Sequence, residues 1–338
     1  MRTDLSLVLF RPDWDALRYT LQTMQSNLSA IAKLRILHSA PTSGAIELLN
    51  QLLIAEGLSQ CCVVTTRSDN LGFAGGHNLL LAQAFAEAAE GVIIVNPDIA
   101  FGPGTITDFV HLAEETGIDA LFGPTLELAD RQEFGSITGG GLVDTRGIAW
   151  TASGRHFDID QGLPVRTCDV TGHELRVRGV SGACLLVTRS TYELIINSCD
   201  GQFFDEMFVA YREDAELGVR AGALGVPSII LKISGIVHAR GTVGYTRGNA
   251  LVDGLGVRNR FLLRYKLGDA RPGRWALPSL RDLLVLAGCL LCERSSIPSF
   301  LESFAVRRWM KYQHRSIWGA VQIGESHSVT NMQQGSRE

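Results

Sequence analysis

Several features of specialised proteins are missing from this sequence. Its 338 residues carry a formal net charge of only −4, so the excess of positive charge expected of a dedicated nucleic-acid binder is absent. The seven cysteines are odd in number and lack the spacing of a disulfide framework, which predicts free thiols in a reducing compartment. Cys289 and Cys292 match C-x-x-C, but they lie inside an apolar helical pattern without a second pair. Neither zinc nor redox chemistry is therefore favoured.

Long apolar runs, internal repeats and low-complexity tracts are also lacking. The first residues lead directly into a strand pattern and do not show the layout of a signal peptide. The apolar run Leu283 to Cys292 is too short to span a bilayer. A hydrophobic content of 46% and a charged content of 20% are typical of an ordinary globular chain. We therefore expect a cytoplasmic protein.

Apolar strand patterns alternate with helical patterns over the first third of the chain. Strands are expected at 5–10, 34–38, 62–65, 91–95 and 120–122, and helices at 14–25, 43–53, 76–89 and 105–116. This alternation predicts an α/β fold, with a mostly parallel sheet covered by helices on both faces. Residues 124–175 are expected to form a loop-rich insertion, because glycines such as the triplet 139–141 punctuate short polar pieces. The triplet lacks the Lys-Ser/Thr of a P-loop.

The central strand of this pattern is Gly91 to Val95, which ends at Asn96-Pro97-Asp98. Proline has no N–H to donate, so the ladder of the sheet ends there and an acidic side chain lies at its carboxyl edge. In open α/β sheets that edge binds ligands. Asn96 and Asp98 are also common turn-forming residues, which is the simpler interpretation.

Two further stretches could take part in chemistry. Glu213 and Asp214 start a helix, where the helix dipole favours ionised carboxylates, although acids are ordinary at helix starts. The segment Asn70 to Asn78 contains three glycines between a strand and a helix, so backbone N–H groups could approach an anion there. It is not G-x-G-x-x-G, which disfavours a dinucleotide-binding dehydrogenase.

Five ordered motifs resemble those of glycosyltransferase family 2, and most closely its rhamnosyltransferase-like branch. They are Asn70-Leu-Gly-Phe-Ala-Gly-Gly-His-Asn78, Asn96-Pro-Asp98, Ser181-Gly-Ala183, Phe204-Asp-Glu206 and Glu213-Asp214, within a match from about Leu5 to Arg260. The resemblance implies a GT-A fold, a Rossmann-like, mostly parallel mixed sheet flanked by helices. It also implies an inverting, metal-dependent hexosyltransferase that moves L-rhamnose from dTDP-rhamnose to a hydroxyl of a surface polysaccharide or lipid-linked glycan. The alternatives are another UDP- or GDP-sugar donor, or a nucleotide-sugar-binding subunit without turnover.

The resemblance also assigns roles to individual residues. Asp214 matches the general base, with Glu213 beside it, and Asp98 the carboxylate that meets Mg²⁺ or Mn²⁺. His238 falls where a further metal ligand often stands, although a lone histidine near a strand can equally be structural. The residues expected to bind the donor are Arg11, Asn70, Gly72, Phe73, Gly75, Gly76, Asn78, Asn96, Ser181 and Gly182.

One departure from the family pattern concerns the nucleotide base. An Asp-Asn-x-Ser type motif usually follows the second strand, whereas this chain has Leu37-His-Ser-Ala-Pro41. The uridine or thymidine identity of the donor is therefore open, and Arg11-Pro12-Asp13 is the candidate substitute.

The expected domains are a GT-A domain at 1–255, a helical extension at 256–318 and a disordered tail at 319–338. Residues 1–123 would form the nucleotide-sugar-binding half and 124–255 the acceptor and catalytic half. From Leu255 onward there are 13 Lys and Arg against 6 Asp and Glu, or +7, which leaves 18 against 29, or −11, for the rest. The basic helices either pack with solvated charges or dock peripherally on the anionic inner leaflet, where a lipid-linked acceptor would lie.

Overall fold

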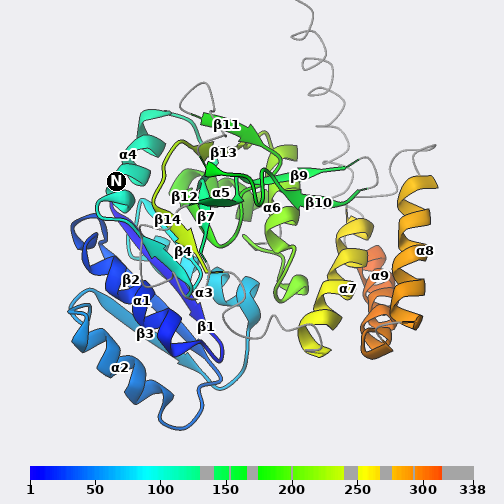
Figure 1. The fold of residues 1–338 in the computed structure, drawn as a ribbon, viewed down its shortest axis with the longest axis horizontal. Coiled ribbons are helices and arrows are strands. Elements are labelled where there is room, and N and C mark those ends of the chain that lie inside the picture. Colours follow the sequence, from blue (N-terminus) through cyan, green and yellow to red (C-terminus); the bar gives the residue numbers. More distant parts are fainter. Residues whose placement is uncertain are drawn as a thin grey trace, which may run out of the picture.

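The computed structural model describes residues 1–129, 141–151, 154–165, 174–198, 201–239, 250–266, 276–291 and 294–313 (Figure 1). Within these ranges the centre is an eight-stranded sheet with the order β11-β13-β6-β12-β4-β1-β2-β3. In chain order its strands are β1 (Thr3–Leu9), β2 (Lys33–Ser39), β3 (Cys62–Arg67), β4 (Gly91–Val95), β6 (Leu121–Pro124), β11 (Glu174–Val177), β12 (Cys184–Thr188) and β13 (Ser228–Leu231). Strands β4, β1, β2 and β3 are parallel, while β12 runs antiparallel to both β4 and β6. The sheet is thus mixed and mostly parallel, as expected.

Helices cover both faces of this sheet. They are α1 (Trp14–Gln25), α2 (Ala45–Ala55), α3 (Gly72–Ala86), α4 (Thr105–Glu115), α5 (Arg189–Ser198) and α6 (Glu213–Ala223). One apolar cluster joins Leu17 of α1, Leu49 of α2 and Phe109 of α4 to the sheet. A second cluster joins Phe85 of α3 and Ile195 of α5, among others, to the opposite face. The strand runs are nearly continuous apolar stretches because the sheet is buried on both sides.

The segment from Pro124 to Leu175 contains more regular structure than its sequence predicts. Strands β7 (Leu126–Leu128) and β8 (Leu142–Thr145) join β5 (Ile99–Phe101) and β14 (Ile236–His238) in a second sheet, and β9 (Ile148–Trp150) pairs with β10 (His156–Asp158). The expectation of a loop-rich insertion is wrong for these residues. Strands of three or four residues are too short to show a periodic pattern, and their partners are distant in sequence. Residues 139 and 140 of the glycine triplet lie outside the described ranges.

Helix α3 begins earlier than expected, at Gly72 instead of Gly76. The three glycines of this motif therefore lie in the first turns of the helix and do not form a separate turn before it. Gly72 adopts φ +70°, and a Cβ atom there would lie 2.4 Å from the carbonyl oxygen of Val209. The Asn70 side chain accepts a hydrogen bond from the Gly72 N–H at 2.9 Å. This local bond and the close approach start the helix before its alanine-rich part.

Helices α7 (Ala250–Lys266), α8 (Ala276–Leu291) and α9 (Ile297–Gln313) form a group beside α6 (Figure 1). Helix α7 packs on α9, with the Phe261 ring 4.9 Å from that of Phe300. It begins eight residues before Arg258, where the sequence pattern places its start. None of the described helices is long and apolar enough to cross a membrane. The predicted disordered tail, 319–338, lies outside the described residues.

Candidate active site

The end of β4 brings together residues that are far apart in sequence. The N–H of Asn96 donates to the Ala183 carbonyl at 2.9 Å, which joins the end of β4 to the Ser181–Ala183 segment. The N–H of Ala239 donates to the Asp98 carbonyl at 3.1 Å. His238 Nε2 lies 3.4 Å from Asp98 Oδ1. The structure therefore places Asp98 and His238 side by side.

The His238 ring lies between two carboxylates. Its Nδ1 is 2.8 Å from Oδ2 of Asp144, which is fully buried. Burial works to lower the pKa of His238, but the charge of Asp98 and the hydrogen bond and charge of Asp144 raise it to about 9. Asp98 Oδ1 is buried without a hydrogen-bond partner among the described residues. Sequence inspection missed Asp144, because it lies in the segment interpreted as loops and belongs to no recognisable motif.

This pair would fit a divalent cation with the His238 ring in its neutral form, because only the neutral imidazole has a nitrogen lone pair to offer. A carboxylate that holds one ring nitrogen of a histidine while the other nitrogen faces the ion is the usual outer-shell arrangement of metal sites. Oxygen ligands such as Asp98 suit Mg²⁺ and Mn²⁺. Within the described residues no group of three His, Cys, Asp or Glu side chains is arranged to hold an ion, so the described protein ligands would be two.

Asp214 stands against the Ser181–Ala183 segment. Its Oδ2 accepts a hydrogen bond from the Gly182 N–H at 3.1 Å, and its Oδ1 accepts one from the Ala215 N–H at 2.8 Å. A Cβ atom at Gly182 would lie 3.1 Å from the Phe73 ring and 3.5 Å from Cβ of Asp214. Glycine at 182 therefore lets Phe73 of the first motif and the predicted base approach each other.

Glu213 is the less satisfied of the two acids. It is 6% exposed, and its Oε2 is buried and has no hydrogen-bond partner within the described part of the chain. Burial and the charge of Asp214 raise the pKa of Glu213 to about 8. Burial also raises the pKa of Asp214, while hydrogen bonds from Gly182 and Ala215 oppose that shift and the charge of Asp158 adds to it. Two adjacent buried carboxyls disfavour double ionisation, so one of them holds a proton more firmly than an exposed acid does.

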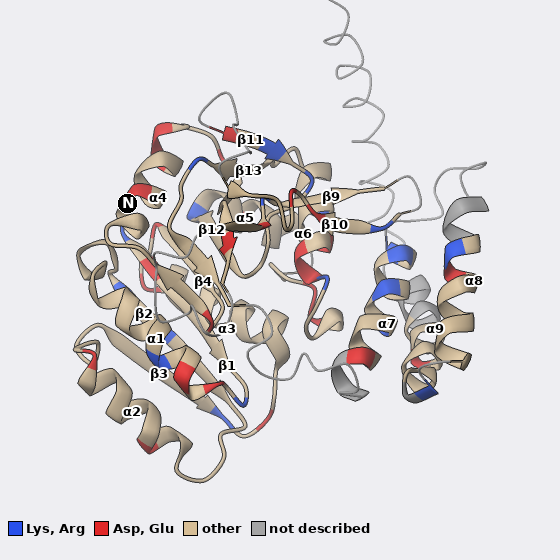
Figure 2. Ribbon diagram, viewed as in Figure 1, with Lys and Arg blue, Asp and Glu red and all other residues tan. Residues whose placement is uncertain are grey.

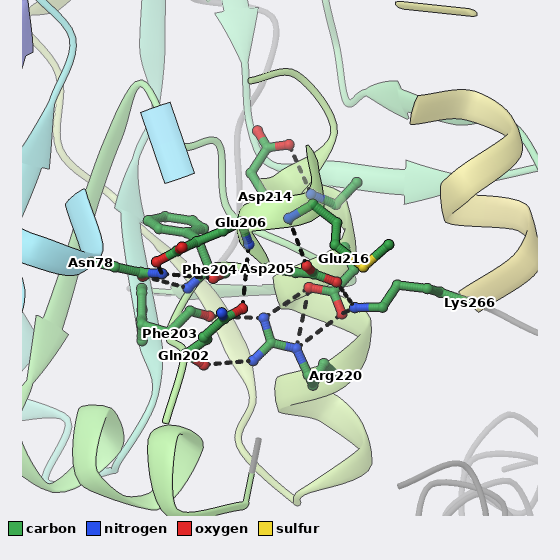
Figure 3. A network of polar contacts seen from close by, with 12 residues as sticks. Asn78, Gln202, Phe203, Phe204, Asp205, Glu206, Asp214, Glu216, Arg220 and Lys266 are labelled. Carbon is green, nitrogen blue, oxygen red and sulfur yellow. Dashed lines mark hydrogen bonds and ion pairs between the residues drawn. The ribbon is translucent and has the colours of Figure 1, made fainter. Parts of the chain in front are cut away.

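The first motif mostly contacts other parts of the protein. Asn78 exchanges two hydrogen bonds of 2.8 Å with the backbone of Phe204, and its Nδ2 also donates to Glu206 at 3.0 Å (Figure 3). A Cβ atom at Gly76 would lie 2.8 Å from a methyl group of Val8, and one at Gly75 would lie 3.3 Å from Cβ of Leu71. These contacts position the motif against β1 and the 203–206 loop. Donor binding by these residues stays a prediction.

The 203–206 loop is itself fixed by buried charges (Figure 3). Lys266 of α7 forms ion pairs with Asp205 and, at 2.9 Å, with Glu216 of α6. Arg220 pairs with Glu216 at 2.8 Å and donates to the Phe203 carbonyl. Burial works to raise the pKa of Glu216, but Arg220 and Lys266 lower it to about 2. This network connects the loop to both α6 and α7.

A strained segment leads into Glu213 and Asp214. Val209, Tyr211 and Arg212 all have positive φ, at 61°, 70° and 74°. The fully buried Asn259 of α7 donates to the carbonyls of Phe208 and Ala210, each at 2.7 Å, and of Tyr211 at 2.9 Å. Such backbone conformations persist only where the surroundings enforce them. Asn259 is thus a structural support of the acid pair that the motifs did not reveal.

Two other residues that are predicted to bind the sugar donor, Arg11 and Ser181, lie in loops. Arg11 is exposed, has φ +47° and lies over the Phe10 ring at 5.3 Å. Asp13, in the same candidate substitute motif, caps α1 by accepting from the N–H groups of Asp15 and Ala16. Ser181 Oγ accepts a hydrogen bond from the Ala183 N–H at 3.3 Å. Arg11 and Ser181 are not in contact with each other in any described interaction.

Comparison with known proteins identifies one enzyme relative and one matching fold. No protein-family model matches the chain. The N-acetylglucosaminyl-diphospho-decaprenol L-rhamnosyltransferase of Mycobacterium tuberculosis, found in two strains, is 25% identical over 248 residues, which cover 67% of this chain and 74% of the relative. A crystal structure of S. aureus TarS matches 98% of this chain with a TM-score of 0.54 at 10% identity. The chain spans 54% of that TarS chain, and 92% of TarS 1–349, where the TM-score is 0.50 at 12% identity.

The fold and the relative together define a glycosyltransferase of the GT-A fold. Within that class, the chain is similar to the L-rhamnosyltransferase of M. tuberculosis, which agrees with the rhamnosyltransferase-like resemblance seen in its motifs.

Proposed function

We propose that this glycosyltransferase moves L-rhamnose from dTDP-rhamnose to a hydroxyl group of a lipid-linked glycan, with inversion at the anomeric carbon. The relative from M. tuberculosis is named for rhamnosyl transfer to a diphospho-decaprenol-linked sugar, which supports this donor sugar and this kind of acceptor. The observation that carries the proposal is the meeting of Asp98, His238 and Asp214 around the Ser181–Ala183 segment. It combines a possible ion-binding pair with a positioned base at one edge of the sheet.

Asp214 is the proposed general base. As the acceptor oxygen bonds to the anomeric carbon, the hydroxyl proton passes to the Asp214 carboxylate, and the bond to the donor diphosphate breaks on the opposite face. Inversion follows from this single displacement, so no protein nucleophile is required. The N–H groups of Gly182 and Ala215 hold the carboxylate in place. The neighbouring Glu213, with its raised pKa, stays protonated and so avoids a second buried charge.

Asp98 and His238 are the residues that would hold Mg²⁺ or Mn²⁺. A bound ion would neutralise the charge that develops on the departing diphosphate. Asp144 keeps the His238 ring in orientation by occupying Nδ1. The protein itself would thus contribute one oxygen ligand from Asp98 and one nitrogen ligand from His238, with the buried Asp144 carboxylate behind the histidine.

Donor recognition is assigned to the motif residues near this edge. Phe73, Ser181 and Gly182 would shape the sugar pocket, because the Phe73 ring packs at Gly182 beside Asp214. Arg11, after β1, would contact the nucleotide in place of the missing Asp-Asn-x-Ser motif. We propose that the protein works in the cytoplasm, peripherally at the inner face of the membrane, where a lipid-linked acceptor is reached.

The test is release of nucleoside diphosphate from a panel of dTDP-, UDP- and GDP-sugars, with Mn²⁺, Mg²⁺ or EDTA and no acceptor. We expect slow release of dTDP from dTDP-rhamnose that EDTA abolishes. Release from another donor instead would replace rhamnose in the proposal. Silence across the panel, with donor binding seen by calorimetry and no transfer to membrane extracts, would favour a binding subunit without turnover.

A further inference from the structure

Arginines from four separate elements lie near the β9–β10 hairpin and the start of α6. Arg212 immediately precedes Glu213, Arg155 immediately precedes β10, Arg260 is on α7 and Arg281 is on α8. We call these four residues the arginine cluster. Arg212 Nη1 lies 3.3 Å from His156 Nδ1 on β10. Figure 2 shows basic segments of α7 and α8 beside the β9–β10 hairpin.

The charges of all four arginines act on one residue, His156. Burial and the charges of Arg212, Arg281, Arg155 and Arg260 lower the pKa of His156 to about 3. Burial and neighbouring arginines likewise lower the pKa of Arg260 and of Arg281 to about 10. The cluster therefore repels further positive charge and attracts anions.

The described carboxylates do not match every donor of Arg260. Asp282 pairs with Arg264, which is on α7 one turn after Arg260, and lies 3.8 Å from Nε of Arg260. Nη2 of Arg260 is nevertheless buried and has no hydrogen-bond partner among the described residues. Leaving a charged donor buried and unpaired is unfavourable, and an anion that accepts from it removes that penalty. Guanidinium groups bind phosphate oxygens through paired N–H donors, so a phosphate is the matching anion.

We infer that the arginine cluster binds the diphosphate of a polyprenyl-diphosphate-linked acceptor. This inference rests on the proposed function and adds the acceptor subsite to it. Arg212 is followed directly by Glu213 and Asp214, so a sugar attached to a diphosphate at the cluster has the base close by. The donor diphosphate has its own proposed partners in Asp98 and His238.

The surface of α8 explains why the diphosphate belongs to a lipid. Five of its leucines point to solvent, with exposed fractions from 49% to 79%: Leu280, Leu283, Leu284, Leu290 and Leu291. The opposite side of the same helix is packed inward, since Cys289 is 3% exposed. Arg281 thus stands on a helix whose outer face is apolar. A polyprenyl chain leaving the cluster meets this leucine face and buries apolar surface there.

Calorimetric binding of farnesyl diphosphate, inorganic pyrophosphate and dTDP tests the inference, all in EDTA so that no ion bridges ligands to Asp98 and His238. We expect Arg281→Gln, and Arg260→Gln more strongly, to weaken binding of farnesyl diphosphate and pyrophosphate about tenfold or more, since a charge-assisted hydrogen bond accounts for such a factor. Binding of dTDP and hydrolysis of dTDP-rhamnose without acceptor should not change. Arg294→Gln, an exposed arginine near the far end of α8, is the matched control and should leave all three ligands unaffected.

A double variant of α8 tests whether the leucine face binds the lipid chain. The double variant Leu283→Ser with Leu284→Ser should weaken the binding of farnesyl diphosphate but not that of pyrophosphate. If the leucine variant binds both ligands equally weakly, or both as well as the wild type, the lipid assignment is overturned. If the arginine variants also lose affinity for dTDP, the cluster is a donor site instead. Circular dichroism checks that each variant folds. If Arg260→Gln does not fold, the binding measurements on Arg281→Gln decide the test. Donor hydrolysis by the wild type tests the proposed function separately, because it needs no acceptor.

Discussion

Removing the Asn259 side chain should uncouple the acid pair from its support. In Asn259→Ala the carbonyl oxygens of Phe208, Ala210 and Tyr211 lose their shared donor. The bond to Phe208 is buried, whereas the other two are partly buried and can be replaced by water. One buried carbonyl left without a donor costs about 1–3 kcal/mol, and each rehydrated bond about 0.5–1 kcal/mol. The expected loss in the free energy of unfolding is therefore about 2–5 kcal/mol.

The larger effect should be on the chemical step. The positive-φ residues at 209, 211 and 212 store strain of about 1–3 kcal/mol each, which is released when the clamp is gone. The segment then relaxes and displaces Glu213 and Asp214. A shift of about 1 Å in a reacting group can lower the rate about 100-fold. We expect kcat to fall on that order while the Kd for the donor changes little, because Asp98 and His238 are supported separately.

Urea unfolding, transfer kinetics and donor calorimetry on the same preparations measure these effects. Ser303→Ala is the matched control: it removes the hydrogen bond from the buried Ser303 to the Phe300 carbonyl on α9, and none of the described hydrogen bonds of Ser303 reaches the 207–212 segment. It should lower stability by about 1 kcal/mol without lowering kcat. If Asn259→Ala loses stability but keeps its kcat, the clamp does not position the acids and the reasoning fails.

Three further outcomes are expected. Asp214→Asn should lower kcat by about 100- to 10,000-fold while calorimetry shows unchanged donor affinity, and retained turnover would remove Asp214 as the base. Burial raises the pKa of Glu213 from 4.5 to about 8, so between these pH values the folded chain holds a proton on Glu213 that the unfolded chain has lost. The free energy of unfolding therefore falls as pH rises through this range, and urea unfolding of Glu213→Gln should show a smaller decline. Gly76→Ala should destabilise the fold by about 1–3 kcal/mol in the same assay, because its Cβ atom would lie 2.8 Å from Val8, and an unchanged midpoint would contradict that packing.

The parts of the fold that sequence reasoning predicted correctly are those with local signals. Helix α1 has its predicted bounds, because the Asp13 cap and an apolar periodicity mark it within one segment. Strand β4 also matches, since Gly91 precedes a buried run that Pro97 ends. The short strands β5, β7 and β14 escaped prediction because each is three residues long and is stabilised by partners far away in sequence.

The same division separates the predicted site residues from the missed ones. Asp98 and Asp214 stand at ends of regular elements, where a motif can mark them from within a few residues. Asp144 and Asn259 matter only through tertiary contacts, the first by holding the His238 ring and the second by holding a loop 50 residues earlier. Since only folding places Asn259 against that loop, a hydrogen-bonding side chain inside α7 carries no local sign of its role. The supporting residues of such a site therefore need a structure, even when its reacting residues do not.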